Sequence, residues 1–270
     1  MELRALYSLI GLPAQMLARL DAARGQVDFT QVEGDLALMM DGRTAAYAYA
    51  HLREALGDDS DKMLCCQLEC ARQAYDRYQA MGIAPDIYIA TMRCFSRFLR
   101  ECERKNGRMF FDRGWWTYRQ ISMSLFRIGV LEYEFSQHEG ENAIALHIPS
   151  DASLCAEAVD TSLAQADAFF QTYFPHFCYS KYTCESWLLS SSLRPLLPEG
   201  SNILAFQNRF QILREETEDQ EYLEWLFQVP PNTDCADLPE RTGLQRKVKA
   251  LLLSGGTVGS AYGIMPRGRY

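Results

Sequence analysis

Two side chains in this sequence have types and surroundings that suit acid–base chemistry, and the first is Glu185. It lies inside Cys184-Glu-Ser-Trp-Leu-Leu189, an apolar stretch with the pattern of a strand. A carboxylate is costly to bury without a partner, so Glu185 is either exposed or a base whose pKa is raised by apolar neighbours. Cys184 beside it is either a packed thiol or a nucleophile, and no histidine signature nearby favours a Cys–His pair.

The second candidate is His147, which begins the segment His147-Ile-Pro-Ser-Asp151. Residues 143–148 have the pattern of a strand and residues 154–174 that of a helix, so this segment joins the two. Backbone N–H groups at a helix start attract phosphate or carboxylate groups, whereas Asp151 also suits a helix cap. The segment is therefore an anion site or a structural cap, and His147 is a base or a hydrogen-bonded rim residue.

Two further patterns carry less specific signals. The nine cysteines are an odd number and lack the paired C-x-x-C spacing of a zinc site. Cys65, Cys66 and Cys70 fall in one expected helix, where adjacent side chains point in different directions, so we expect buried thiols and no metal ion. Gly255-Gly-Thr-Val-Gly259 lacks the lysine of a P-loop and the spacing of a dinucleotide loop, which favours a hinge or tight turn.

Composition limits the class of protein. The 270 residues are 48% hydrophobic, enough for one large domain or two small ones with a real core. The net charge of -8, from 27 basic and 35 acidic residues, argues against a nucleic-acid partner or an anionic membrane surface. No apolar run of about 18 residues and no export signal is present, so we expect no membrane span and a cytoplasmic location.

Helical patterns occupy the first part of the chain, up to the polar break Lys105-Asn-Gly107. The strongest pattern begins at Pro85 and continues to about residue 104, with apolar side chains at steps of three and four on one face. The helix before it has cap residues at Asp58-Asp-Ser60 and ends near Gly82, which fits the left-handed position after a helix. We therefore expect a helical bundle at residues 1–110.

From residue 131 the pattern changes to that of a sheet. Leu131, Tyr133 and Phe135 alternate with polar residues, and with residues 143–148 they predict a β-hairpin. We expect further strands at 182–189, 210–215, 222–229 and 258–265, and helices at 154–174, from 201 and at 244–253. The fold class is then α/β (α+β), with a helical N-terminal bundle followed by a mixed-sheet domain at residues 111–270.

Four stretches together resemble a known family. They are Asp112-Arg-Gly-Trp-Trp-Thr-Tyr-Arg-Gln120, Phe126-Arg-Ile-Gly-Val-Leu-Glu-Tyr-Glu134, His147-Ile-Pro-Ser150 and Ser201-Asn-Ile-Leu-Ala-Phe206. This set is similar to a bacterial family of predicted acyltransferases, which pair a helical N-terminal domain with a domain similar to the GNAT superfamily of acyl-CoA N-acyltransferases. The resemblance covers nearly the whole chain. It implies a GNAT-like domain, acyl-CoA or acetyl-CoA as co-substrate, and an amine of a small molecule or peptide as acceptor.

The resemblance also assigns residues to the site. In typical GNAT proteins the fourth strand and the following helix hold the pyrophosphate of acyl-CoA through a glycine-containing loop, and the matching residues 147–152 lack those glycines. The implied acyl-CoA contacts are Ile148, Ser150, Asp151, Ala152 and Asn202. Phe206 stands where such enzymes often carry a tyrosine acid, which leaves Tyr182 or Tyr262 to replace it.

Two functions of different classes follow. In the first, the chain transfers an acyl group from acyl-CoA to an amine, with Glu185 or His147 as base, acting through water, and Tyr182 as acid. In the second, it is a binding or scaffold protein on a degenerate GNAT-like fold, which the absence of the glycine loop favours. Binding of an acyl-CoA distinguishes the two.

Overall fold

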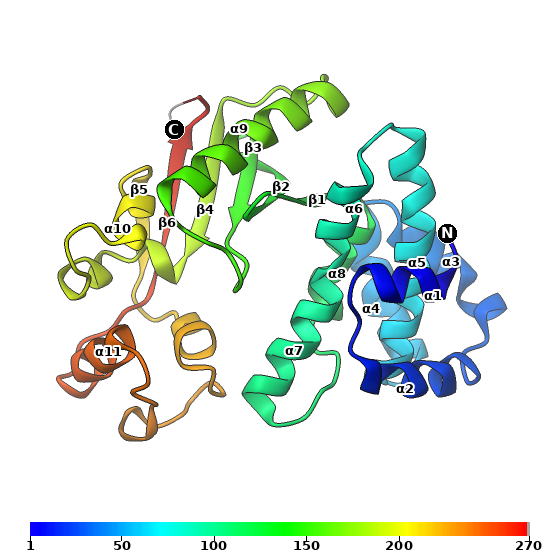
Figure 1. Cartoon of the computed structure of the whole chain (residues 1–270), viewed down its shortest axis with the longest axis horizontal. Coiled ribbons are helices and arrows are strands. Elements are labelled where there is room, and N and C mark those ends of the chain that lie inside the picture. Colours follow the sequence, from blue (N-terminus) through cyan, green and yellow to red (C-terminus); the bar gives the residue numbers. More distant parts are fainter. Residues whose placement is uncertain (269–270) are drawn as a thin grey trace. The chain divides into compact units, whose positions relative to one another are not determined.

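The computed structural model describes residues 1–268 and separates into two compact units, Met1–Arg127 and a second that begins at Ile128. The helices of the first unit are α1 (Leu3–Leu9), α2 (Ala14–Arg24), α3 (Phe29–Met39), α4 (Ala45–Ala55), α5 (Ser60–Ala80), α6 (Pro85–Met92), α7 (Cys94–Asn106) and α8 (Gly114–Ile121). Helix α5, the longest of them, packs against α1, α2, α3, α6 and α8 (Figure 1). The expected helical bundle is confirmed.

Local chemistry explains where α5 begins and ends. The Asp59 carboxylate accepts hydrogen bonds from the N–H groups of Asp61 and Lys62, at 2.9 and 3.1 Å, and so satisfies two donors of the first turn. After the helix, Gly82 has a φ of +73°, a conformation that glycine adopts without strain. Both ends lie where the sequence predicts them.

The single helix expected from Pro85 to residue 104 is interrupted at one residue, Arg93, which separates α6 from α7. Thr91 provides a physical reason. Its hydroxyl donates to the Ile87 carbonyl at 2.8 Å, a side-chain hydrogen bond that bends helices. The same oxygen accepts from the Arg127 N–H at 3.0 Å, a tertiary hydrogen bond close to the interruption.

The first unit extends past residue 110 because α8 packs on α4 and α5. Gln67 of α5 donates to the Gly114 carbonyl at 2.8 Å. A β-carbon added at Gly114 would lie 2.9 Å from Tyr49 Cε2 and 3.2 Å from Met63 Cγ. The structure therefore places the division after α8, whereas the sequence prediction placed it before the aromatic run that α8 contains.

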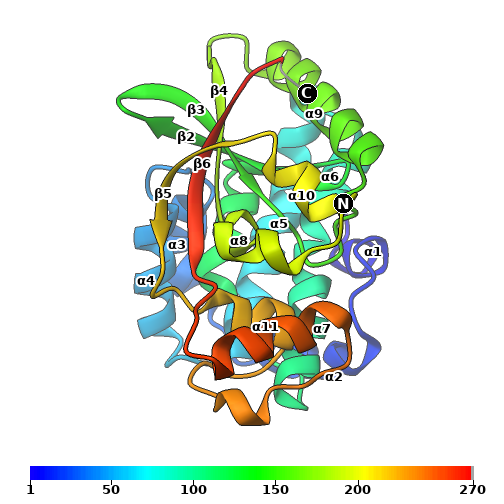
Figure 2. The same cartoon turned by 90° about the vertical axis from the view of Figure 1, so that its left-hand side faces the viewer.

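A six-stranded mixed sheet organises the second unit within the described residues. Its strands are β1 (Leu125–Ile128), β2 (Leu131–His138), β3 (Glu141–His147), β4 (Lys181–Ser186), β5 (Gln211–Glu216) and β6 (Ser260–Pro266), and their order is β1-β2-β3-β4-β6-β5. β3 and β4 are parallel, whereas β2–β3, β4–β6 and β5–β6 are antiparallel. Figure 2 shows β5 beside β6. The fold class and the hairpin are confirmed.

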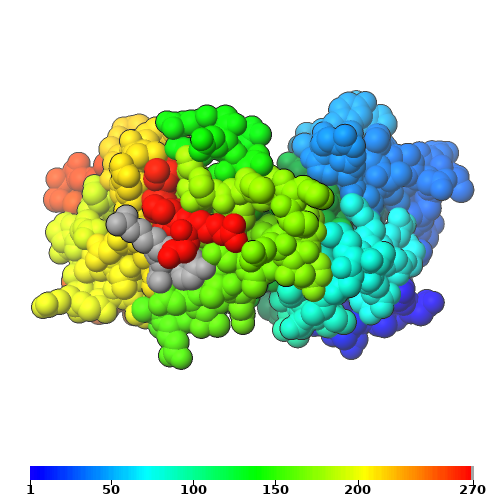
Figure 3. Space-filling model, turned by 90° about the horizontal axis from the view of Figure 1, so that it is seen from above, coloured from blue at the N-terminus to red at the C-terminus, as the bar shows by residue number. Residues whose placement is uncertain are grey.

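Helix α9 (Ala156–Tyr173) covers one face of this sheet (Figure 1). Tyr133 and Phe135 of β2 lie 6.5 and 5.3 Å from Phe170 of α9 between ring centroids, in edge-to-face geometry. Beyond the C-terminal end of α9, the Arg267 N–H donates to the Ser180 carbonyl at 2.9 Å. Figure 3 shows this C-terminal end of β6 in red, at the surface beside the yellow-green segment that leads into β4.

The strand expected at residues 222–229 is wrong. Leu223–Phe227 (η3) forms a π-helical turn, and its buried residues Leu223 and Phe227 are spaced as on a helix. They pack in a separate apolar cluster with Trp187, Leu193, Tyr222, Leu238, Val248 and Val258. Helix α11 (Gly243–Leu253) supplies Val248 and is closed at its start by a capping box between Thr242 and Gln245.

The cysteines lie within the described residues and none forms a disulfide. Cys65, Cys66 and Cys70 are buried in α5, and burial raises the pKa of the Cys66 thiol to about 12. Among residues 1–268, no group of three or more His, Cys, Asp or Glu side chains is arranged to hold a metal ion. In the same part of the chain, every helix is too short or too polar to cross a membrane.

Candidate functional site

The carboxyl ends of the parallel strands β3 and β4 mark the candidate site. Pairing between them ends at Leu146 and Cys184, so His147 and Glu185 are the next residues on each strand. Beyond them the chain leaves the sheet, toward α9 on one side and toward η1 (Trp187–Leu189) on the other. In open α/β sheets, ligands bind in the crevice outside the carboxyl ends of such strands.

Strand alternation assigns His147 and Glu185 to the same face of the sheet. Tyr182 of β4 contacts α9, so Glu185, three positions further on, points to the opposite face. His147 shares that face because Leu146 is paired with Cys184 on the α9 side. We call this opposite face the polar face. Its titratable or charged members are Glu132, Glu134, His138, Glu141, His147, Lys181, Glu185, Arg214, Glu216 and Tyr262.

His147 is held by a carboxylate on the neighbouring strand. Its Nε2 lies 2.8 Å from Glu134 Oε2, and the two side chains are only 24% and 20% exposed. An ionised Glu134 accepts hydrogen bonds only, so His147 Nε2 is the donor in this bond. A histidine oriented by a carboxylate is the arrangement that activates a general base.

Glu185 is not the buried carboxylate that its apolar neighbours allowed. Its side chain is 53% exposed, and Oε1 lies 3.1 Å from Arg214 Nη2. Arg214 also lies 2.6 Å from Glu216 through its Nε. The exposed alternative is therefore confirmed, and the burial on which the other alternative depended is absent. The physical reason is alternation, because only every second residue of β4 faces the apolar layer under α9.

Tyr182 lies on the other face of the sheet and is fully buried. Its hydroxyl donates to Asp167 Oδ1 of α9 at 2.6 Å and lies 3.1 Å from the Tyr179 hydroxyl. Arg267 Nε donates to the same Asp167 oxygen at 2.9 Å. Burial first, and then the neighbouring Tyr179, raise the pKa of Tyr182 above its ordinary value of 10.0. These contacts occupy the Tyr182 hydroxyl away from the polar face and favour a structural role for it.

The segment expected to hold acyl-CoA connects β3 to α9. Ile148 and Ala152 are half-buried, Ser150 and Asp151 are exposed, and the Ala152 N–H donates to the Pro149 carbonyl at 2.9 Å in a turn. Asn202 is exposed in the first turn of α10 (Asn202–Gln207), which Ser201 caps. Four of the five residues thus lie in the segment that leads into α9, Asn202 lies at the start of α10, and these two helices contact each other.

The sequence suggested that Asp151 caps α9, but the structure places another residue in that position. The residue in the cap position is Cys155, four residues later. Hydrogen bonds from Ser153 and from the Ala158 N–H hold the pKa of the Cys155 thiol below its ordinary value of 9.0. Independently of the thiol, backbone N–H groups at the start of a helix such as α9 favour negative charge.

Sequence reasoning missed two members of the site, Glu134 and His138. Glu134 lies opposite Ala145, two residues before His147, so the hairpin register brings it to the histidine. The alternation of Glu132 and Glu134 with apolar residues, read together with His147, was a usable signal. His138 approaches Tyr262 of β6, a contact between residues far apart in the chain that no local pattern reveals.

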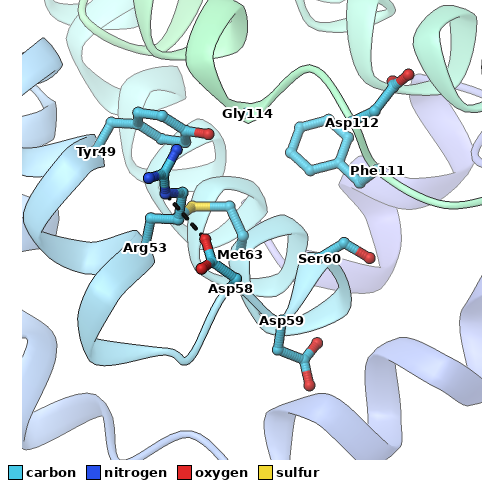
Figure 4. Close-up of a pocket in the computed structure, with 9 residues that line it drawn as sticks. All are labelled: Tyr49, Arg53, Asp58, Asp59, Ser60, Met63, Phe111, Asp112 and Gly114. Carbon is cyan, nitrogen blue, oxygen red and sulfur yellow. Dashed lines mark ion pairs between the residues drawn. The ribbon is translucent and has the colours of Figure 1, made fainter.

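A separate small pocket lies within the helical unit. Its volume is about 70 Å³, and it is lined by Tyr49, Arg53, Asp58, Asp59, Ser60, Met63, Phe111, Asp112 and Gly114 (Figure 4). Arg53 Nε and Asp58 Oδ1 form an ion pair of 2.9 Å beside it. A space of this size holds a few water molecules and is far smaller than a cofactor site.

Comparisons with known proteins agree with this architecture. A family model of the GNAT-like C-terminal domain matches residues 125–265, and one of the N-acyltransferase N-terminal domain matches residues 1–123. None of the curated protein sequences matches the chain.

The fold is similar to solved acyltransferase structures. One, in complex with decanoyl-CoA and teicoplanin, has a TM-score of 0.83 and 21% identity, with 98% of this chain and 88% of that chain covered. A mutant in complex with octanoyl-CoA has a TM-score of 0.83 and 20% identity, with 98% and 87% covered. A third, in complex with CoA and 10C-teicoplanin, has a TM-score of 0.73 and 18% identity, with 99% and 100% covered. By its domain matches, this chain belongs to the acyltransferase family that joins an N-acyltransferase N-terminal domain to a GNAT-like C-terminal domain.

Proposed function

We propose that this protein transfers an acyl group from acyl-CoA to an amine of a small molecule or peptide. The observation that carries the proposal is the His147–Glu134 pair, 2.8 Å apart, at the carboxyl end of β3 and beside the segment that leads into α9. An ammonium group must lose a proton before its nitrogen can attack a thioester. In this proposal His147 Nδ1 takes that proton, and Glu134 stabilises the resulting imidazolium.

The segment from Ile148 to Cys155 suits the phosphates of acyl-CoA in one respect and departs from the usual pattern in another. The first N–H groups of α9 lie at the helix start, where the helix dipole favours an anion. Without glycines, the loop backbone approaches a pyrophosphate less closely. We assign acyl-CoA binding to Ile148, Ser150, Asp151, Ala152 and Asn202, with Ser150 as hydroxyl donor. Solved acyltransferases of similar fold are in complex with decanoyl-CoA or octanoyl-CoA, which supports this assignment.

The acceptor is the less constrained half of the proposal. The family name specifies N-acylation, and one acyltransferase of similar fold is in complex with the glycopeptide teicoplanin. The polar face exposes Glu185 and Arg214, so a hydrophilic amine can approach the carboxyl ends of β3 and β4 from that side. We therefore favour a polar amine on a peptide or small molecule.

Calorimetric titration with acetyl-, octanoyl- and decanoyl-CoA tests the proposal, followed by mass spectrometry of a panel of amines incubated with each donor. We expect binding of at least one acyl-CoA and an acylated amine. His147→Gln should bind the same donor and lose turnover, which separates binding from chemistry. Absence of binding heat and of any thermal shift for every donor would favour the alternative, a scaffold protein on a degenerate GNAT-like fold.

A further inference from the structure

Arg214 is an exposed cation that three neighbours hold in place on the polar face. Its Nη2 lies 3.1 Å from Glu185 Oε1, and its Nε lies 2.6 Å from Glu216 Oε1. Its Cζ lies 5.2 Å from the centre of the Tyr262 ring, and the hydroxyl of that ring is 2.8 Å from His138 Nδ1. The guanidinium therefore has a fixed position, although the arginine side chain is 52% exposed.

One nitrogen of this guanidinium, Nη1, makes no hydrogen bond or ion pair within residues 1–268. Arginine presents its donors in a planar fork that matches the oxygens of a carboxylate, and Nη1 remains available to such a group. Because the two glutamates already hold the fork, a carboxylate that binds there does not have to order a free arginine side chain. Arg214 is thus prepared to bind a negatively charged group.

The register of the sheet places this cation at the level of the proposed base. Arg214 is opposite Tyr262, and Tyr262 is opposite Glu185. Glu185 follows the last β4 residue that pairs with β3, as His147 follows its partner on β3. His147 and Arg214 therefore belong to one row across the polar face. The guanidinium reaches back to Glu185 on β4, and β4 is only one strand spacing, about 5 Å, from β3.

The order of charges along this row matches that of a zwitterion. The carboxylates of Glu134 on β2 and Glu185 on β4 lie on either side of His147, and Arg214 lies on the far side of Glu185. A positively charged amine is favoured between the two carboxylates, and a negative group is favoured at the arginine. One molecule meets both requirements when its amine and its carboxylate are about 5–10 Å apart, one to two strand spacings.

We propose that the acceptor is an amine that also carries a carboxylate, as in an amino acid or a short peptide with a free carboxyl end, and that Arg214 selects it by binding this carboxylate. The inference rests on the proposed acyl transfer, to which it adds the class of acceptor. The carboxylate takes no part in the reaction, so its contact with Arg214 is the same before and during acyl transfer. The contact therefore lowers the KM for such acceptors and leaves kcat unchanged.

The test uses acceptors in matched pairs. The wild-type protein and Arg214→Gln are given octanoyl-CoA with β-alanine, γ-aminobutyrate, ε-aminohexanoate or diglycine, and with the amide of each, which keeps the amine and the length but lacks the negative charge. We expect Arg214→Gln to lose about 10- to 100-fold in kcat/KM with the best carboxylate acceptor, through KM, and to stay within about threefold of wild type with its amide. Arg214→Lys keeps the charge but not the fork, so its loss should be smaller.

The control is Arg246→Gln, which removes one positive charge from an exposed position on α11 of the same unit. It should leave the ratio of carboxylate to amide rates unchanged. An unchanged Arg214→Gln, equal losses with carboxylates and amides, or a wild-type preference for the amides would overturn the role of Arg214 and leave acyl transfer standing. Absence of octanoyl-CoA binding by the wild-type protein would overturn the acyl-transfer proposal itself, and this role with it.

Discussion

Tyr182 and Glu185 belong to the same short strand, β4, yet their side chains leave opposite faces of the sheet. The Tyr182 hydroxyl donates to Asp167 of α9 at 2.6 Å, whereas the Glu185 carboxylate lies 3.1 Å from Arg214 at the surface. One strand thus supplies a buried structural hydrogen bond and an exposed ion pair. Each arrangement has consequences that can be measured.

The buried tyrosines predict loss of stability in alkali. Burial raises the pKa values of Tyr179 and Tyr182 above the ordinary 10.0, so the folded protein keeps protons that the unfolded chain loses above pH 10. Their contribution is complete below pH 10 and falls as the pH rises, by at most about 1.4 kcal/mol per pH unit for each tyrosine. Urea titrations between about pH 8 and pH 11 measure this slope. An unchanged slope in Tyr182→Phe would contradict the assignment.

The exposed Glu185–Arg214 ion pair predicts that Glu185→Gln changes stability and turnover only slightly. A surface ion pair contributes about 0.2–1 kcal/mol, so the free energy of unfolding should change by no more than that. Since His147 is the proposed base, turnover should stay within about threefold and its pH profile should not shift. Steady-state rates against pH check this. A fall of about 10² or more with intact folding would return Glu185 to the role of base.

The His147–Glu134 pair predicts a large loss of turnover when His147 is replaced and a smaller loss when Glu134 is replaced. His147→Gln removes the basic nitrogen and should lower turnover by about 10²–10⁴ while acyl-CoA binding persists. Glu134→Gln keeps the size of the side chain but removes the charge that orients and stabilises the imidazole, so we expect a smaller loss and an altered pH profile. Turnover against pH for both variants is the measurement. Equal turnover of Glu134→Gln and wild type would show that Glu134 does not assist His147 in catalysis.

Much of the fold was predictable because its signals are local. Alternation at Leu131, Tyr133 and Phe135 predicted the hairpin, and helical spacing predicted α9. The failures have physical causes. β1 has only four residues, too few for a periodic signal, and η3 buries Leu223 and Phe227 at helical spacing within a stretch whose composition suits a strand.

The candidate site was predictable only in part. His147 and Glu185 could be selected because a polar group in an apolar stretch is conspicuous, but the sequence does not reveal which face of β4 meets α9. Tyr182 is a candidate acid in the sequence because Phe206 lacks a hydroxyl. The sequence does not show that the Tyr182 hydroxyl is bonded to Asp167, because that residue lies in a different element. The contact between His138 and Tyr262 depends on how the β2–β3 hairpin meets β6, and only tertiary structure supplies that relation.

In the helical unit, Gly114 predicts a steric cost that a second glycine does not share. A methyl group at Gly114 would meet Tyr49 and Met63 at 2.9 and 3.2 Å, so Gly114→Ala should destabilise the protein by about 1–3 kcal/mol. Gly34 of α3 has nothing within 4 Å of its added β-carbon, so Gly34→Ala should stabilise by about 0.5–1 kcal/mol. Urea denaturation of both variants gives the comparison. Equal stabilities would mean that Tyr49 moves without strain.

The last prediction uses Cys155 to locate acyl-CoA. Its thiol has a lowered pKa because Ser153 and the Ala158 N–H donate to it, so a larger fraction is thiolate at neutral pH. We expect iodoacetamide to alkylate half-buried Cys155 faster than the exposed Cys178, and Ser153→Ala to slow this reaction.

If acyl-CoA lies at the start of α9, octanoyl-CoA should slow alkylation of Cys155 and leave Cys178 unaffected, because Cys178 follows the far end of that helix. Peptide mass spectrometry after timed alkylation gives both rates in one sample, so Cys178 serves as the internal control. Free CoA should protect as well if the phosphates, rather than the acyl chain, occupy the helix start. Binding of octanoyl-CoA detected by calorimetry without any protection of Cys155 would place the co-substrate away from α9.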